Sequence, residues 1–251
     1  MKDSVPASCL PAHHMHVQLL IGDCDSIFIE FELHRLLQFI KQRPYDKNIV
    51  MKNLMFDLGG VIMEIERRRA VDALKSIGLA DADEMLGEYG QKGIFLELEL
   101  GNVTPAQWRD ELRRHIKGDV TDAEIDRAFE KFLIGIPESR LKELEELHHD
   151  HKLYLLSNTN KVMWDDMILS EFRKDGHDIN YYFDGVIPSF EVHCYKPDAE
   201  IFHKACEKFG IRPEDTIFFD DSKANVEAAR ALGFGGVHVA DNRPFKEYLD
   251  K

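Results

Sequence analysis

Short, continuous apolar runs that alternate with segments of helical periodicity are the feature that most limits how this chain can fold. Such runs are typical of strands buried on both faces of a parallel sheet, and the amphipathic segments between them are typical of helices that cover the sheet. The sequence therefore predicts an α/β fold with a parallel sheet and helices on both faces. The expected strands span residues 53–57, 153–157, 184–188, 216–220 and 236–239.

Two helices of this fold have clear start and stop signals. Pro197 stands at a first-turn position before apolar residues at helical spacing, and Gly210 follows the last of them. Ser222 is a residue that can cap a second helix, which Gly233 would end. Proline at the start and glycine after the end are the usual punctuation of a helix.

A long segment without apolar runs separates the first two expected strands. Its helical patterns predict a small helical cap, residues 64–149, inserted after the first strand of a core made of residues 51–63 and 150–251. Residues 1–50 are expected to be a poorly packed N-terminal extension, on the hypothesis that Met51 is the true start. The helices expected in the cap cover residues 69–77, 82–89, 108–116, 122–133 and 138–149.

Charge and hydropathy exclude several classes of protein. The chain has 32 Lys and Arg against 46 Asp and Glu, a net charge of −14 that repels a nucleic-acid backbone. The apolar stretch at residues 17–40 is interrupted by charged side chains, which excludes a membrane span. Its opening run, residues 17–21, is too short for a signal-peptide core. The four cysteines show no spacing typical of a zinc site or a disulfide framework. We therefore expect a cytoplasmic protein with neither nucleic acid nor membrane as a partner.

Polar residues stand at the ends of four expected segments, in a fixed order along the chain. Each one alone has an ordinary structural explanation, as a turn residue, a helix cap or a solvated charge. In an open α/β sheet, however, ligands bind at the carboxyl ends of the strands, where these side chains would gather. The ordered set is Asp57, then Ser157 with Asn158, then Lys196, and last Asp220 and Asp221 with Asn225.

The motifs around these residues resemble those of the haloacid dehalogenase-like hydrolase superfamily, over residues 53 to about 240. The motifs are Phe-Asp-Leu-Gly-Gly-Val, Leu-Leu-Ser-Asn-Thr-Asn, Lys-Pro-Asp and Phe-Phe-Asp-Asp-Ser. Within the superfamily they look most like the sugar phosphatases related to α-D-glucose-1-phosphate phosphatase. The resemblance implies a Rossmann-like core, a helical cap, Mg²⁺ as cofactor, and hydrolysis of a small phosphate ester through an aspartyl-phosphate.

The metal that this resemblance implies fits the residue types present. A carboxylate that attacks a phosphoryl group meets negative charge, so cations must screen both partners. Mg²⁺ prefers oxygen ligands and often takes only one or two carboxylates, for which Asp57 and Asp221 are the natural pair. The resemblance adds the backbone carbonyl of Gly59. Asp220 is expected to orient the metal site or the lysine, and Asn225 faces the same site one helical turn further on.

The remaining residues of the set are expected to bind the phosphoryl group. Lys196 would place its ammonium on the phosphoryl oxygens and stabilise the transition state. Ser157 and the amide of Asn158 would donate hydrogen bonds to a phosphoryl oxygen. Gly59 and Gly60 would let the backbone approach the phosphate without a side-chain clash.

One position departs from the pattern of the superfamily. Its phosphatases usually carry a second aspartate two residues after the nucleophile, as general acid and base, and here that residue is Gly59. Loss of such a group typically costs about 10²–10⁴-fold in rate. Two explanations are open: a good leaving group, such as that of an anomeric phosphate, needs less help, or a carboxyl group from the cap contributes. The candidates in the cap are Glu64, Glu66, Glu97 and Glu99.

Three other functions remain open from the sequence. A hydrolytic haloacid dehalogenase of the same fold uses an aspartate nucleophile on carbon, but such enzymes typically lack the paired acids seen at Asp220 and Asp221. A signalling receiver domain uses similar residues in a different order and in a shorter chain. A catalytically weak member that only binds a phosphorylated ligand is the third, because of Gly59.

Overall fold

Five parallel strands form the central sheet of the computed structural model, which describes residues 53–87 and 91–249. The predicted N-terminal extension, residues 1–50, lies outside the described residues. All four pairings in the sheet are parallel, so the predicted α/β fold is confirmed. In spatial order the strands are β5 (Gly185–Pro188), β4 (Lys152–Ser157), β1 (Asn53–Phe56), β6 (Thr216–Asp220) and β7 (Gly235–His238).

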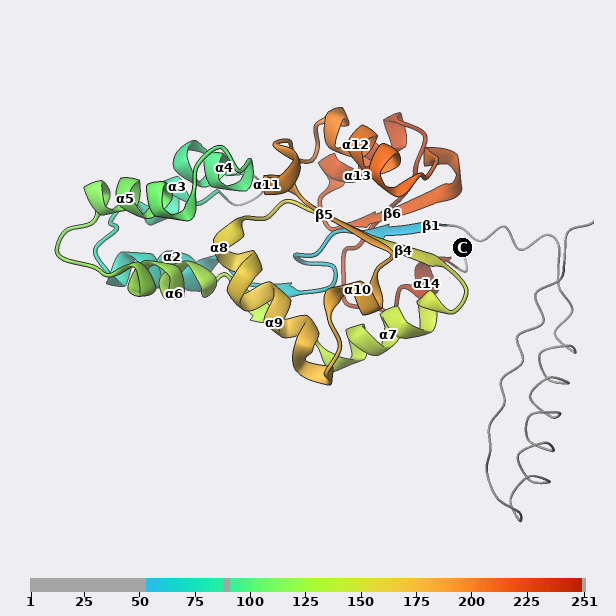
Figure 1. Ribbon diagram of the computed structural model, residues 1–251, viewed down its shortest axis with the longest axis horizontal. Coiled ribbons are helices and arrows are strands. Elements are labelled where there is room, and N and C mark those ends of the chain that lie inside the picture. Colours follow the sequence, from blue (N-terminus) through green and yellow to red (C-terminus); the bar gives the residue numbers. More distant parts are fainter. Residues whose placement is uncertain (1–52, 88–90, 250–251) are drawn as a thin grey trace, which may run out of the picture. The chain divides into compact units, whose positions relative to one another are not determined.

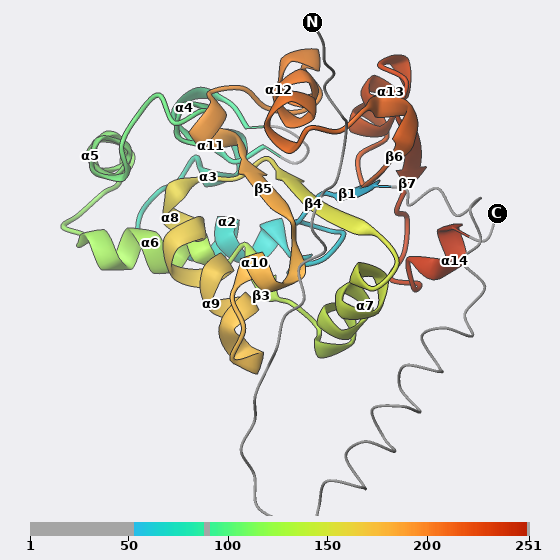
Figure 2. The same ribbon diagram turned by 45° about the vertical axis from the view of Figure 1, so that its right-hand side comes forward.

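Side chains on the strands alternate between two hydrophobic layers, one on each face of the sheet. In β1, Leu54 and Phe56 belong to one layer and Met55 to the other, and all three are completely buried. Figures 1 and 2 show helices on both sides of the sheet. One side carries α12 (Ala199–Phe209) and α13 (Lys223–Ala231); the other carries α7 (Glu138–His148), α10 (Ile179–Tyr182) and α14 (Lys246–Leu249).

A helical segment lies between β1 and β4, joined to the sheet by a short two-stranded ribbon. Phe95, Trp108 and Phe129 form its centre, with ring centroids 5.0–5.6 Å apart. Its elements are β2 (Glu64–Ile65), α2 (Arg67–Ser76), α3 (Ala82–Met85), α4 (Gly93–Glu99), α5 (Pro105–His115), α6 (Asp122–Glu130) and β3 (Leu133–Gly135).

Several features of this segment differ from the sequence-based expectation. The helix expected over 82–89 ends at Met85, and α4 was not among the expected helices. The helix expected over 122–133 ends at Glu130, because residues 133–135 pair with β2 in an antiparallel ribbon too short to show a periodicity. Helix α7, expected to belong to the cap, packs instead against β4 and α10 on the face of the sheet. We therefore propose that the cap ends near residue 135 instead of residue 149.

Shorter elements connect the remaining strands. The predicted start of α12 at Pro197 falls two residues early, while Gly210 ends the helix in the left-handed conformation, as expected. Ser222 does stand at the N-cap of α13, but its side chain accepts no capping hydrogen bond. Of the helices in residues 53–87 and 91–249, none is both long and apolar enough to cross a membrane. The connecting elements are α8 (Lys161–Met163), η1 (Trp164–Ile168), α9 (Leu169–Phe172), η2 (Arg173–Asp175), α11 (Ser189–Val192) and η3 (Pro213–Asp215).

Candidate active site

The three central strands bring three of the sequence-predicted residues to one edge of the sheet. Because β4, β1 and β6 are adjacent and parallel, their carboxyl ends lie side by side. Ser157 and Asp220 are the last residues of β4 and β6, and Asp57 directly follows β1. The backbone N–H of Asp57 donates to the Phe219 carbonyl at 2.8 Å, which ties the end of β1 to β6. The edge geometry expected from the sequence is therefore present.

Lys196 lies at the centre of this edge and joins two of the carboxylates. Its Nζ is 2.7 Å from Asp57 Oδ1 and 2.8 Å from Asp220 Oδ2, and its side chain is 1% exposed. The Asn158 side chain fixes the main chain of Lys196, donating to its carbonyl and accepting from its N–H at 2.8 Å each. An ammonium has three donors. The third makes no hydrogen bond or ion pair with a described residue, so it remains for a ligand.

Asp220 is the most heavily hydrogen-bonded residue of the cluster. Its Oδ1 accepts from the Ser222 N–H at 2.8 Å and from Asn225 Nδ2 at 3.0 Å, while its Oδ2 faces Lys196. Both oxygens therefore already have donors, and the residue is fully buried. This geometry suits a residue that positions Lys196 and the turn leading to Asp221. Asn225 acts on the same carboxylate, so its side-chain amide reaches the cluster through Asp220.

Three carboxylates meet at this edge and make it a suitable site for a hard cation. Oxygens of Asp57, Asp220 and Asp221 lie within 4.8 Å of one another. Within residues 53–87 and 91–249, Lys196 is the only cation that forms an ion pair with these carboxylates, which gives the cluster a formal charge of −2. Carboxylate oxygens are the ligands that Mg²⁺ prefers. Asp221 is exposed to solvent, so an ion can reach the cluster from outside. The donor set thus fits the cofactor that the sequence implies.

Burial and neighbouring charges shift the pKa values of the two central groups, Asp57 and Lys196. Burial raises the pKa of Asp57 to about 7; Lys196 opposes the rise, and the neighbouring Asp220 and Asp221 add to it. Burial acts to lower the pKa of Lys196, but the charges of Asp220 and Asp57 outweigh it, so this pKa is raised. Lys196 therefore stays an ammonium, and a bound cation would favour the ionised form of Asp57.

Gly60 is required for a reason that the sequence did not show. Its φ is +73°, in the left-handed region, and a Cβ there would overlap the carboxyl group of Asp221. The room made by this glycine is therefore taken by a carboxylate of the cluster, where the sequence analysis expected the phosphate. Gly59 lines the cavity described next.

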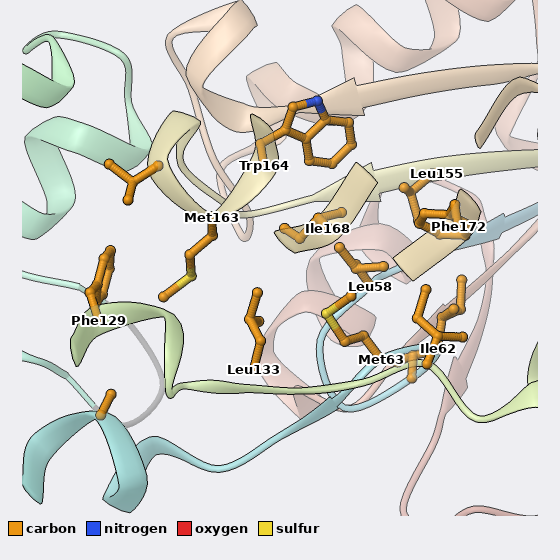
Figure 3. Packing of buried hydrophobic residues seen from close by; sticks show 14 of the residues in the cluster. Leu58, Ile62, Met63, Phe129, Leu133, Leu155, Met163, Trp164, Ile168 and Phe172 are labelled. Atoms are coloured by element: carbon orange, nitrogen blue, oxygen red, sulfur yellow. The ribbon is translucent and has the colours of Figure 1, made fainter. Parts of the chain in front are cut away.

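A cavity opens above the carboxylate cluster, with a polar floor and largely apolar walls. The floor contains every sequence-predicted site residue except Gly60, which lies against Asp221, and Asp220, which contacts Lys196. Figure 3 shows the apolar side chains of Phe129 and Leu133 in the cap facing those of Met163 and Ile168 in the core. The floor residues are Asp57, Gly59, Ser157, Asn158, Lys196, Asp221 and Asn225, and the walls include Met63, Ile65, Phe129, Phe132, Leu133, Met163 and Ile168.

Two residues near the cavity were not singled out for binding by the sequence analysis. The buried Ser189 follows β5 directly, and its hydroxyl accepts from the Thr159 N–H at 3.0 Å. Thr159 itself lines the cavity. The available signal was the position of a polar residue just after the third expected strand, residues 184–188. Of the four glutamates considered as acids, all of which are described, only Glu99 lines this cavity. Burial raises the pKa of Glu99 to about 8, the charge of Asp57 adds to the rise, and Lys196 opposes it.

Comparison with known proteins agrees with this fold and site. Residues 51–233 match the family model of haloacid dehalogenase-like hydrolases. D-ribitol-5-phosphate phosphatase from Bacteroides thetaiotaomicron is 35% identical over 185 residues, which are 74% of this chain and 90% of that protein. The chain therefore belongs to the haloacid dehalogenase-like hydrolases, and the family predicted from the four motifs is confirmed.

Two solved structures place the fold within this family. One is an aspartate-to-alanine variant of a haloacid dehalogenase family enzyme from Bacteroides thetaiotaomicron, in complex with magnesium and inorganic phosphate. It is 34% identical, has a TM-score of 0.76, and the match covers 80% of this chain and 100% of that one. The other is L-2-haloacid dehalogenase from Xanthobacter autotrophicus, with 19% identity, a TM-score of 0.53, and coverage of 80% and 83%. At that identity the likeness concerns the fold alone.

Proposed function

We propose that this protein is a Mg²⁺-dependent phosphatase that hydrolyses a small phosphorylated metabolite through an aspartyl-phosphate on Asp57. One observation carries the proposal: the buried ammonium of Lys196 contacts Asp57 and Asp220, and Asp221 completes a carboxylate cluster beneath a cavity. Attack on a phosphoryl group requires a carboxylate whose negative charge, and that of the phosphate, are screened by nearby cations. Here Asp57 has the Lys196 ammonium on one side and a site for a metal ion beside it.

The metal would be held by the carboxylates of Asp57 and Asp221 and, by resemblance, by the backbone carbonyl of Gly59. Bound Mg²⁺ supplies positive charge that screens the phosphoryl oxygens from the attacking carboxylate. Asp220 is left to position Lys196, since its two oxygens already accept from Ser222, Asn225 and Lys196.

In the first half of the reaction, a carboxylate oxygen of Asp57 attacks the phosphorus and the ester bond to the leaving oxygen breaks. The free donor of Lys196 and the hydroxyl of Ser157 bind the phosphoryl oxygens. The Ser157 hydroxyl lines the cavity floor and makes no hydrogen bond to a described residue, so it can donate to a ligand. These donors stabilise the charge that spreads over the oxygens in the transition state.

In the second half, water attacks the phosphorus of the aspartyl-phosphate, releases inorganic phosphate and restores Asp57. The apolar side chains of Phe129, Leu133 and Met163 keep bulk water away from the floor, which strengthens the electrostatic interactions there. The cap thus contributes the walls, while the sheet contributes the reacting groups.

The best substrate class is a sugar or polyol phosphate. The motifs resemble those of sugar phosphatases, and the 35%-identical relative is named for a polyol phosphate. A net charge of −14 disfavours nucleic acid as an alternative phosphate source.

A cytoplasmic location is consistent with Cys194 and Cys206, which are free thiols.

The dehalogenase alternative is less well supported. Dehalogenation on carbon needs no divalent cation, whereas Asp57, Asp220 and Asp221 gather three carboxylates at one point. A phosphorylated-ligand binder without turnover fits the same geometry, so the experiment must separate binding from release.

The test is a phosphate-release screen over a panel of sugar and polyol phosphates with millimolar Mg²⁺, repeated with EDTA and with Asp57→Asn. We expect Mg²⁺-dependent release from the wild type and none from the variant, which should retain the wild-type circular dichroism spectrum. Release that survives EDTA, or that persists in Asp57→Asn, would overturn the proposal. A parallel assay with a 2-haloacid in EDTA tests the alternative, because halide release there would identify a dehalogenase. Saturable binding of a sugar phosphate without phosphate release would identify a binder.

A further inference from the structure

The position normally occupied by the general acid is Gly59, so the proposed phosphatase lacks an obvious proton donor for its leaving oxygen. We propose that Glu99, the last residue of cap helix α4, donates the proton to the leaving oxygen. This inference rests on the proposed function and adds a catalytic residue to it.

Glu99 is placed where such a donor must be. It lines the same cavity as Asp57, Ser157 and Lys196, although it comes from the cap and they come from the core. The other three candidates in the described chain lie elsewhere: Glu64 and Glu66 are exposed, and the Glu97 carboxylate accepts from Asn102 Nδ2 at 2.9 Å. The Glu99 side chain makes no hydrogen bond or ion pair with any described residue, so its carboxyl group is available to a ligand.

Three contacts fix this end of α4 against the core. The Ser189 hydroxyl donates to the Glu99 carbonyl at 2.7 Å, and His193 Nδ1 donates to the Leu100 carbonyl at 2.8 Å. Gly101, with φ of +66°, lies so close to the Phe190 carbonyl that a Cβ would overlap it. Glu99 is therefore held at the carboxyl edge of the sheet, as a group acting on the reacting atoms must be.

The surroundings of Glu99 favour a carboxyl group that carries a proton. Burial disfavours the charged form of an acid, and the cavity walls include the apolar side chains of Phe129 and Met163. The Asp57 carboxylate acts in the same direction, and the Lys196 ammonium opposes it.

The proposed step balances in both halves. As the bond from Asp57 to phosphorus forms and the ester P–O bond breaks, the Glu99 carboxyl transfers its proton to the leaving oxygen, which departs as an alcohol. The Glu99 carboxylate then accepts a proton from the water that attacks the aspartyl-phosphate. That attack breaks the bond between Asp57 and phosphorus, releases inorganic phosphate and restores the Glu99 carboxyl.

The test compares leaving groups in Glu99→Gln, which keeps the shape of the side chain but cannot act as the acid. Two substrates are used: the sugar or polyol phosphate that the wild type hydrolyses fastest, and 4-nitrophenyl phosphate, whose leaving group is a stable anion. We expect kcat to fall by about 10²–10⁴-fold on the first substrate and by less than about tenfold on the second. Glu97→Gln, two residues away on the same helix, is the matched control and should match the wild type on both.

Each outcome decides the matter. A fall of equal size on both substrates, an effect on KM alone, or no effect would overturn the role of Glu99 while leaving the phosphatase intact. A wild type that hydrolyses neither substrate with Mg²⁺ would instead remove the proposed function itself. Thermal unfolding of both glutamine variants, with midpoints equal to that of the wild type, shows that the comparison concerns chemistry and not folding.

Discussion

Replacing Lys196 with methionine should destabilise the protein strongly, because the lysine compensates two buried carboxylates. Its ammonium is 2.7 Å from Asp57 and 2.8 Å from Asp220, and the side chains of the lysine and of Asp220 are 1% and 0% exposed. Methionine keeps the apolar length of the side chain and removes the charge. The variant therefore leaves Asp57 and Asp220 in contact with no cation.

Removal of one partner from a buried ion pair typically costs about 3–5 kcal/mol. For a domain of this size, about 2–4 °C of melting temperature is lost per kcal/mol, so we expect the midpoint to fall by about 6–20 °C at pH 8. The loss should be smaller at pH 5. The pKa of Asp57 in the folded protein is about 7, above the ordinary value of 3.8, so at pH 5 this carboxyl is already protonated and needs no counter-charge. Because its pKa is higher in the folded protein, protonated Asp57 adds to the free energy of unfolding at low pH. This contribution is lost as the pH rises through the folded-state pKa.

The assay is thermal unfolding by circular dichroism in EDTA, since a divalent cation would itself offset the missing charge. The double variant Lys196→Met with Asp220→Asn removes one of the stranded carboxylates and should recover much of the loss at pH 8. A fall of less than about 2 °C at pH 8 would refute the reasoning. Equal losses at pH 5 and pH 8 would refute it as well, because they would show that ionised Asp57 is not the cause.

Three further predictions follow from neighbouring residues. Mg²⁺ at one hundred times its Kd should stabilise the wild type by about 2.7 kcal/mol in scanning fluorimetry, and Asp221→Asn should lose most of this gain; an equal gain in both would exclude Asp221 as a ligand. Gly60→Ala forces a Cβ against the Asp221 carboxyl group at a left-handed φ, so its Mg²⁺ titration should shift to higher concentration, and an unchanged titration would contradict the fit. Ser189→Ala leaves the Thr159 N–H without its acceptor and should cost about 1–3 kcal/mol in urea unfolding, whereas a cost near zero would show that this contact does not hold the cap end at Glu99.

The core of the site was predictable because its strands are strongly apolar and end in polar residues. Once β4, β1 and β6 are recognised as parallel neighbours, Ser157, Asp57 and Asp220 must meet at one edge. The fixed order of the motifs and their resemblance to a known family then indicated the chemistry. Local sequence was sufficient here because each residue is placed by the strand that it follows.

Features that depend on distant contacts were not predictable in the same way. The β2–β3 ribbon has too few residues to show a periodicity. The amphipathic pattern of α7 shows that one face of the helix is buried, but it does not show whether that face packs on the cap or on the sheet. The position of Glu99 depends on Ser189, which is 90 residues further along the chain, so the sequence left it as one of four equal candidates. The reason for Gly60 was missed because its neighbour Asp221 comes from the opposite end of the domain.

The most direct test of the account is to trap the phosphorylated residue. Wild-type protein is mixed with Mg²⁺ and the best substrate from the screen, quenched in acid and treated with borohydride, which reduces an aspartyl-phosphate to homoserine that mass spectrometry can locate. The account predicts homoserine at position 57, and none in EDTA or in Asp57→Asn. Phosphate release accompanied by a phosphorylated residue other than Asp57, or by none at all, would contradict it.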